Sequence, residues 1–321
     1  MNSGVLKVGI IGAGKIGASF DSPNDEMVIS HAHGYYNHDG FEIVGFVDTQ
    51  FDQAELAAEK WGGKAYRTIS DLFANEEVDV VSVCSLTESH YDILKELESH
   101  DQLVGGIIEK PLASTIEEAR EIKDSDFYKD RSFLINYKRR FLPEYKEIKK
   151  LISSGDLGSF LNGTVYYGKG LQHNAVHALD LLSYLGLSFD NVDYVKSKKS
   201  YDSFVDYEAV LSNETGGNIH LVSISAKYYK VFEQDLFFEK GRIKFGDEGC
   251  PVVQFDIAED VLFEGYMSPV EKRVLESNAD KVMNYVVDSL YNSINKSRQL
   301  ECSIDDGFET QISVSNILKV S

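Results

Sequence analysis

The glycine-rich stretch at residues 12–17, G-A-G-K-I-G, constrains the fold of this chain more than any other segment. Residues 5–11 before it form a β-branched run typical of a buried parallel strand, and residues 15–20 after it can open a helix. In such a unit the first glycine permits a tight turn, the second lets a pyrophosphate approach the backbone, and the third lets the helix pack on the strand. The sequence therefore predicts a dinucleotide site, with candidate contacts at Gly12, Gly14, Lys15, Ile16 and Gly17.

A second apolar run, residues 41–47, ends directly before Asp48. A carboxylate there can accept hydrogen bonds from both hydroxyls of an adenosine ribose. It would repel a 2′-phosphate, and Thr49 and Gln50 after it offer no positive charge, so NAD is favoured over NADP as the cofactor. Asp48 lies 31 residues after Gly17, against roughly 20 in the usual fingerprint, and we assign the surplus to a polar loop at residues 21–26. The alternative is a glycine turn that binds nothing and an aspartate that only caps a helix.

The net charge of −20, from 32 basic and 52 acidic residues, argues against two classes of partner. A surface of this charge repels nucleic-acid backbones and anionic membranes, so neither is expected to bind. No apolar run approaches the roughly 18 residues of a membrane span, and no signal-peptide pattern opens the chain. The three widely spaced cysteines, Cys84, Cys250 and Cys302, indicate reduced thiols, a cytoplasmic location and no disulfide or zinc framework.

Strands alternate with helices in the first part of the chain. This pattern predicts an α/β domain over residues 1–140 with a doubly wound parallel sheet, whose ligands bind at the carboxyl ends of the strands. Lys110 follows a strand and therefore falls on the cofactor side. The expected strands are residues 5–11, 41–47, 78–84, 103–108 and 132–136, and the expected helices are residues 53–60, 70–74, 89–99 and 115–123, the last opened by a capping box of Ser114 and Glu117.

The pattern changes in residues 141–321, which we assign to a second domain for substrate binding and oligomerisation. Pro143 opens a helix that Gly155 closes, and helices return at residues 280–296 and, opened by Ser303 and Asp306, at the C-terminus. Runs of strands without helices between them predict a large, mostly antiparallel open sheet. An uncovered apolar face on such a sheet predicts a homodimer or homotetramer. The expected strands are residues 160–167, 192–196, 204–211, 218–227, 232–244 and 252–257.

His173 and His177 are four residues apart and Asp180 follows three later, so on one helix the three would share a face. They are open to three interpretations. As metal ligands they lack the glutamate of the metalloprotease motif, whose place Asn174 takes, and no metal is expected. As structural residues they are partly buried polar groups at a helix start. As acid and base, a histidine and Lys110 suit the deprotonation of an alcohol while hydride leaves.

Seven motifs in order along the chain carry a resemblance that covers nearly all of it. They are GAGKIG at residues 12–17, VD at 47–48, VCS at 83–85 with His90 after it, EKPLA at 109–113, NYKRRFLP at 136–143, GDLG at 155–158 and HALDLL at 177–182. Each motif alone is degenerate. Together they resemble the glucose-fructose oxidoreductase / inositol dehydrogenase / MocA (Gfo/Idh/MocA) family of nicotinamide-dependent dehydrogenases.

The resemblance implies a Rossmann domain joined to an α/β domain with a large, mostly antiparallel sheet, and a substrate pocket between them. It implies that Lys110 lies beside the nicotinamide and the substrate hydroxyl, with His177 as the main acid/base residue. It adds Ser85, His90 and Glu109 to the candidate cofactor contacts. The bond before Pro111 is often cis in such proteins.

Two positions depart from the family pattern. His173 stands where many members carry an aspartate four residues before the catalytic histidine, and Leu86 stands where proline is usual. The basic residues at 138–140 could bind a substrate phosphate or carboxylate, or else form a solvated turn or ion pairs. The candidate substrate contacts are Lys110, Arg140, His173, Asn174 and His177.

The leading hypothesis is an NAD-dependent oxidoreductase that acts on a secondary alcohol of a sugar, cyclitol or sugar nucleotide, with Lys110, His177 and His173 as catalytic candidates. One alternative is redox-neutral use of tightly held NAD, as in an epimerase or lyase. Another is a dinucleotide or sugar sensor without turnover. The presence of both Lys110 and His177 argues against the sensor, and the missing aspartate argues weakly for it.

Overall fold

The computed structural model describes residues 4–199, 204–214 and 216–320, and the chain divides into two compact units. Unit 1 is Met1–Leu142 with Ala279–Gln311, and unit 2 is Pro143–Asn278 with Ile312–Ser321. The first boundary lies two residues from the expected one at 140. The expectation that all of 141–321 forms one domain differs from the structure, because α9 (Val282–Lys296) returns to pack on α1 (His31–Tyr36) and β6 (Ser132–Ile135) of unit 1.

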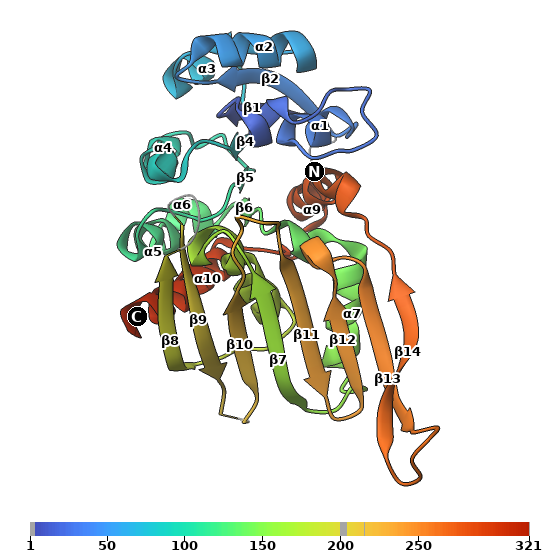
Figure 1. Cartoon of the computed structure of the whole chain (residues 1–321). Coiled ribbons are helices and arrows are strands. Elements are labelled where there is room, and N and C mark those ends of the chain that lie inside the picture. The colour runs from blue at the N-terminus through green and yellow to red at the C-terminus, as the bar shows by residue number, and fades with distance from the viewer. Residues whose placement is uncertain (1–3, 200–203, 215, 321) are drawn as a thin grey trace. The chain divides into compact units, whose positions relative to one another are not determined.

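Unit 1 is built on a six-stranded, wholly parallel sheet in the order β3-β2-β1-β4-β5-β6 (Figure 1). The central strands are buried on both faces, which explains their near-continuous apolar runs. The strand order reverses between β1 and β4, the kind of position where such sheets bind ligands. The doubly wound fold expected from the sequence is confirmed. The remaining strands are β1 (Leu6–Ile11), β2 (Phe41–Val47), β3 (Lys64–Tyr66), β4 (Val80–Val83) and β5 (Gly105–Ile108).

The expected helix after the glycine turn is replaced by a single π-turn, η1 (Lys15–Ser19). A separate helix, α1, begins at His31, after the polar loop. The helix expected to begin at Ser114 is capped one residue later, since Thr115 Oγ1 accepts the Glu118 N–H at 3.2 Å and Glu118 closes the capping box. The other helices of unit 1 are α2 (Phe51–Trp61), α3 (Ile69–Asn75), η2 (Thr87–Ser89), α4 (His90–Leu97), α5 (Ile116–Asp124), α6 (Asp126–Lys129), η3 (Lys138–Phe141) and η6 (Ala279–Lys281).

Unit 2 contains an eight-stranded sheet in the order β14-β13-β12-β11-β7-β10-β9-β8 (Figure 1). Within this sheet, β7 and β10 form the only parallel pair among the described strands, so the expected large, mostly antiparallel sheet is confirmed. The strands are β7 (Phe160–Tyr167), β8 (Asn191–Lys199), β9 (Val205–Ser212), β10 (Asn218–Ser223), β11 (Phe232–Phe238), β12 (Gly241–Phe245), β13 (Val252–Glu259) and β14 (Met267–Leu275).

Two strand expectations in unit 2 are wrong. The run at 232–244 is a hairpin of two strands, because Glu239 and Lys240 turn the chain. The edge strand β14 is missing from the expected set because Pro269 and its charged neighbours hide the apolar alternation, as is common at sheet edges.

One face of the large sheet is buried and the other is half exposed. Helix α7 (Pro143–Ser153) packs on the buried face, where Tyr145 stacks on Phe245 with ring centroids 5.4 Å apart. Along β11, Phe232 and Leu236 point to the buried face. Phe237, the next residue, points to the other face and is 39% exposed. The other helical segments are η4 (Leu171–Ala175), α8 (Val176–Tyr184), η5 (Asp247–Gly249) and α10 (Ile304–Val320). Across the described residues we find no helix with the length and apolar character to cross a membrane.

Candidate functional site

The three glycines of the turn after β1 have different surroundings. Gly12 has a φ of +97°, and a Cβ on it would lie 2.7 Å from the backbone of Cys84 and Ser85. A Cβ on Gly17 would lie 2.0 Å from the Gly12 carbonyl oxygen, whereas a Cβ on Gly14 would meet no atom within 4 Å. Packing within unit 1 therefore requires glycine at the first and third positions, and the space at the second is open to a ligand.

Asp48 is fixed beside this turn by backbone donors. Its Oδ2 accepts the Ala13 N–H at 2.9 Å and its Oδ1 accepts the Gln50 N–H at 2.8 Å. Its own N–H donates to the Tyr66 carbonyl at 3.3 Å, which joins the ends of β2 and β3. The carboxylate thus lies at the carboxyl end of β2, next to the glycine turn, in the place expected for a ribose contact.

Arg67 is a charged residue at this edge that is not among the site residues expected from the sequence. It follows Tyr66 at the end of β3, and its guanidinium stacks on the Phe51 ring at 4.2 Å. The three residues directly after Asp48 carry no charge, but the pairing of β2 with β3 brings in this cation from the next strand. No sequence signal identifies Arg67, because its place depends on strand pairing.

The remaining expected cofactor contacts lie in the glycine turn and in the loop after β4. In η1, Lys15 is exposed and Ile16 is half-buried. His90 is buried, with Nδ1 2.8 Å from the Pro111 carbonyl and Nε2 3.2 Å from the Ser85 carbonyl. Both ring nitrogens thus face backbone, and His90 ties the loop after β4 to the loop after β5.

Glu109 and Lys110 directly follow β5, at the same sheet edge as the glycine turn. The Lys110–Pro111 bond is cis. Burial lowers the pKa of Lys110 below its ordinary value and the charge of Arg139 lowers it further, whereas the charge of Glu109 raises it. A lysine whose pKa is lowered can accept and return a proton nearer neutral pH.

Glu109 is held by two side chains that are not among the expected site residues. Its Oε1 lies 2.9 Å from His31 Nε2 and accepts the Asn136 Nδ2–H at 2.6 Å. Burial raises the pKa of Glu109, but interactions with His31, Asn136 and Lys110 outweigh burial, so this pKa lies below its ordinary value. Asn136 had a signal, because it follows β6 as Glu109 follows the adjacent strand. His31 had none, since its contact depends on the packing of α1.

Arg140, an expected substrate contact, is only 3% exposed. Its Nη1 donates to Asp306 Oδ1 at 2.8 Å. Burial raises the pKa of Asp306, but Arg140 and Ser303 outweigh this effect and lower it. Ser303 and Asp306 form the expected cap of α10. This geometry fits the ion-pair alternative, in which Arg140 joins η3 to the start of α10.

The sequence predicted one α-helix for the histidine segment of unit 2, but the structure divides this segment into two elements. His173 and Asn174 lie in the π-turn η4, and His177 lies in the first turn of α8. His173 is exposed and its ring lies 5.2 Å from that of Phe204, whereas His177 is half-buried and Asp180 is 1% exposed. The wider π-turn thus changes the angular spacing on which a common face would depend.

The segment before η4 is anchored within unit 2. Lys169 and Gly170 have φ values of +63° and +83°, and the Gly170 N–H donates to Asp206 Oδ1 at 2.7 Å. Asp206 is only 2% exposed. The start of the π-turn that carries His173 is therefore fixed by a buried carboxylate.

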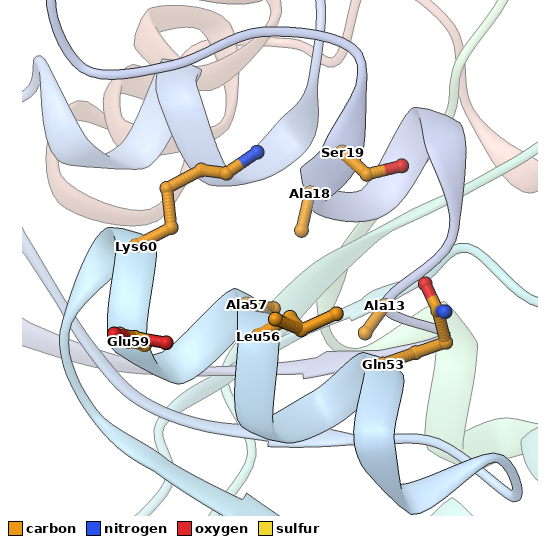
Figure 2. Close-up of a pocket in the computed structure, with 8 residues that line it drawn as sticks. All are labelled: Ala13, Ala18, Ser19, Gln53, Leu56, Ala57, Glu59 and Lys60. Carbon is orange, nitrogen blue, oxygen red and sulfur yellow. The ribbon is translucent and has the colours of Figure 1, made fainter.

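A pocket of about 380 Å³ lies between η1 and α2 (Figure 2). Ala13, whose N–H donates to Asp48, lies at one end, and Lys60, whose Nζ donates to the Asp21 carbonyl at 3.2 Å, lies at the other. The lining residues of the pocket are Ala13, Ala18, Ser19, Gln53, Leu56, Ala57, Glu59 and Lys60.

The structure thus brings the glycine turn, Asp48, Ser85, Glu109 and Lys110 to one edge of one sheet in unit 1. It places His173, Asn174 and His177 on one segment of unit 2.

Comparison with known proteins shows which proteins this chain resembles. Residues 6–136 match the Gfo/Idh/MocA model described as "Oxidoreductase family, NAD-binding Rossmann fold". The chain is 24% identical over 261 residues to inositol 2-dehydrogenase 3 of Saccharopolyspora erythraea, covering 75% of this chain and 73% of that protein. It is 31% identical over 160 residues to D-glucoside 3-dehydrogenase of Escherichia coli, covering 49% of this chain and 42% of that protein.

Two solved structures share the fold over nearly the whole chain. An oxidoreductase from Agrobacterium radiobacter, in complex with NAD+, L-tartaric acid and magnesium, has a TM-score of 0.77 at 14% identity and covers 99% of this chain and 97% of its own. UDP-N-acetylglucosamine 3-dehydrogenase from Acidithiobacillus ferrooxidans has a TM-score of 0.76 at 16% identity, covering 97% and 96%. These matches bear out the expected resemblance to the family, whose NAD-binding model matches residues 6–136.

Proposed function

We propose that this protein is an NAD-dependent dehydrogenase acting on a secondary alcohol, or the matching ketone, of a sugar, cyclitol or sugar nucleotide. The observation that carries the proposal is Lys110, a lysine of lowered pKa at the same sheet edge as the glycine turn. Relatives named for inositol and D-glucoside oxidation support the alcohol class. The solved UDP-N-acetylglucosamine 3-dehydrogenase has the same fold, and its name supports the inclusion of sugar nucleotides in the proposal.

The residues of unit 1 fit a dinucleotide. The open space at Gly14 admits a pyrophosphate, and the fixed carboxylate of Asp48 can accept ribose hydroxyls. Asp48 favours NAD, and Arg67 on the neighbouring strand is a cation that a 2′-phosphate could use. Bound NAD would supply the ring that accepts hydride during oxidation and returns it during reduction.

The residues of the chain handle the proton. When the alcohol is oxidised its hydroxyl loses a proton, and we assign the uptake of that proton to Lys110 Nζ. In the reverse direction the same lysine returns it to the new hydroxyl. We assign His177 as the second acid/base group, and His173 and Asn174 as hydrogen-bonding contacts of the substrate. Such roles suit an imidazole, which titrates near neutral pH.

Alanine variants of Lys110 and His177 test this chemistry on a panel of sugars, cyclitols and sugar nucleotides. Each substitution should lower kcat by roughly 10²-fold or more, because each removes a proton-transfer group. NADH affinity, measured by fluorescence titration, should change by less than about threefold, since most proposed contacts lie at the glycine turn and Asp48. The double variant should lose less than the product of the single losses if both residues act on one proton.

His220→Ala, in β10, is the control and should retain turnover. His173→Ala should be less harmful than His177→Ala. Near-normal turnover by both the Lys110 and His177 variants would refute the mechanism. If the unmutated protein binds NADH but turns over no member of the panel, redox-neutral catalysis or sensing replaces dehydrogenation.

A further inference from the structure

A chain of buried polar groups runs from Glu109 into the core of unit 1. His31 is fully buried, with Nε2 2.9 Å from Glu109 Oε1 and Nδ1 3.1 Å from Ser82 Oγ. Ser82 Oγ in turn lies 2.9 Å from the Tyr35 hydroxyl. None of these groups except Glu109 belongs to the dinucleotide or proton-transfer roles assigned above. Burying polar groups costs folding free energy unless each of them is hydrogen-bonded, so this buried series is expected to have a role.

We propose that His31 is a positioning residue, which holds the Glu109 carboxylate so that its second oxygen, Oε2, accepts a hydroxyl of a ligand bound at Lys110. This inference rests on the proposed function. The hydroxyl is that of a dinucleotide ribose or of the sugar substrate, which share this chemistry.

The bonds of Glu109 divide unequally between its two oxygens. Oε1 is engaged by both His31 and Asn136, while Oε2 bonds to no group in residues 4–199, 204–214 or 216–320. The Glu109 side chain is 14% exposed, so it is not sealed in the core. Both oxygens of a carboxylate can accept hydrogen bonds, so Oε2 is the oxygen that can accept one from a ligand.

Along this series of buried groups, each donor finds an acceptor when the hydrogen bonds run from Tyr35 toward Glu109. The Tyr35 hydroxyl can donate to Ser82, the Ser82 hydroxyl to His31 Nδ1, and His31 Nε2–H to Glu109. In this arrangement each hydrogen has one acceptor and the imidazole carries its proton on Nε2. The partner of one ring nitrogen then determines what the other nitrogen offers.

This series of hydrogen bonds positions the Glu109 carboxylate and does not conduct protons. It ends at Tyr35, which is 1% exposed, and burial raises the pKa of that hydroxyl well above its ordinary value. A proton passed from Glu109 to His31 would have no route to solvent through this end. What remains is a fixed orientation of the His31 ring and of the carboxylate it holds.

The surplus residues between the glycine turn and Asp48 deliver His31 to this place. Asp21, 5% exposed, accepts the N–H groups of Ile29 at 2.6 Å and Ser30 at 3.0 Å, and also bonds the Ser30 hydroxyl. Ser30 caps α1 by accepting the His33 N–H at 3.2 Å. His33 Nδ1 lies 3.1 Å from Asp21 as well. The loop is thus tied down immediately before His31.

The charge of Glu109 also acts on Lys110. Among the described residues, Glu109 raises the pKa of Lys110 and Arg139 lowers it, while His31, Lys110 and the Cys84 thiol are the titratable groups that interact with Glu109. Loss of the carboxylate from its place should therefore lower the pKa of Lys110 further, because the protonated amine loses its nearby negative charge.

Two polar variants of His31 separate the bond to Glu109 from simple packing. The amide of His31→Gln reaches the position of Nε2 and keeps a donor for Glu109, whereas that of His31→Asn reaches only the position of Nδ1. His31→Asn should weaken binding of the ligand hydroxyl about tenfold, and His31→Gln less than about threefold. The pKa of Lys110, measured by NMR on labelled lysine, should fall in His31→Asn and in Glu109→Gln, and remain unchanged in His31→Gln.

The source of the hydroxyl follows from two measurements. A raised Kd for NADH without substrate assigns it to the ribose, and a raised KM at unchanged NADH affinity assigns it to the sugar. His38→Gln, beyond the end of α1, is the control and should change neither. Thermal melting shows that each variant is folded.

Two results would overturn the proposal. One is a folded His31→Asn whose NADH affinity, KM and Lys110 pKa all equal those of the unmutated protein. The other is a His31→Gln as impaired as His31→Asn, which would assign His31 to packing alone. NADH binding without turnover of any sugar by the unmutated protein would instead defeat the proposed function, while the NADH and NMR measurements would still decide the role of His31.

Discussion

At the scale of single residues, two opposite charges at one sheet edge are expected to act on a bound dinucleotide. Asp48 is fixed by the N–H groups of Ala13 and Gln50, so its carboxylate cannot turn away from a ligand without losing both bonds. Arg67 is held by stacking on Phe51 and is exposed. A fixed carboxylate repels a 2′-phosphate, and a nearby arginine attracts one. We expect the carboxylate to dominate because the glycine turn itself holds it.

NADH should therefore bind the unmutated protein roughly tenfold or more tightly than NADPH, as expected when hydrogen bonds to a charged group are lost. Asp48→Ala should reduce this preference, since it removes both the ribose acceptor and the repulsion. Arg67→Ala should weaken NADPH binding and leave NADH binding within about twofold. Fluorescence titration with each reduced cofactor gives the three ratios. Equal or tighter NADPH binding by the unmutated protein would contradict the assignment.

At the scale of the element, the glycine turn separates a structural from a ligand-related need for glycine. Gly17 has no room for a methyl group, because its Cβ would lie 2.0 Å from the Gly12 carbonyl oxygen. Gly14 has room on every side and a φ of −68°, which any residue adopts. The same sequence motif thus contains one glycine that the fold needs and one that only a ligand would need.

Gly14→Ala should leave the melting temperature within about 2 °C of the unmutated protein and weaken NADH binding at least about tenfold, because the new methyl group occupies the space proposed for pyrophosphate. Gly17→Ala should destabilise the fold by about 1–3 kcal/mol, as overpacking does. Thermal melting and NADH titration measure both. Gly4→Ala, whose Cβ would also meet nothing within 4 Å, is the control. Unweakened NADH binding by Gly14→Ala would place the dinucleotide elsewhere.

At the scale of the whole molecule, the half-exposed face of the large sheet is the clearest surface for self-association. On it, Arg242 forms a bidentate pair with Asp235 and lies over the rings of Phe237 and Phe255 at 4.9 and 5.1 Å. This face mixes aromatic rings with matched charges, as protein interfaces often do. A second copy can cover such a face by a two-fold axis.

We propose that the protein is a homodimer or homotetramer that associates through this face, and light scattering at micromolar concentration should find more than one subunit per particle. Phe255→Asp should shift the particle toward monomer, because it places a charge in the contact. Each chain carries a net charge of −20, so association should strengthen from 0.05 to 0.5 M salt, by about tenfold or less. A monomer at all of these conditions would contradict this expectation.

Local patterns were sufficient for much of unit 1. The glycine turn, the strand ending at Asp48 and the strand ending before Glu109 each follow from neighbours in sequence, and the parallel pairing then brings their carboxyl ends to one edge. The same reasoning would have included Asn136 at the end of β6. It failed for the hairpin at 232–244, where a turn of only two residues separates the strands. It also failed for β14, where Pro269 interrupts the alternation of apolar and polar residues.

The sequence by itself determined the doubly wound fold, the dinucleotide turn and the Glu-Lys-Pro segment, because these depend on short-range periodicity and on backbone conformations that glycine permits. Only the tertiary structure decided which groups act on them. Arg67 reaches the edge of Asp48 by strand pairing, Arg140 is taken up by Asp306, and His31 reaches Glu109 through a tied loop. Such contacts between distant residues leave no trace in local patterns, since their energy depends on burial and orientation that exist only once the chain has folded.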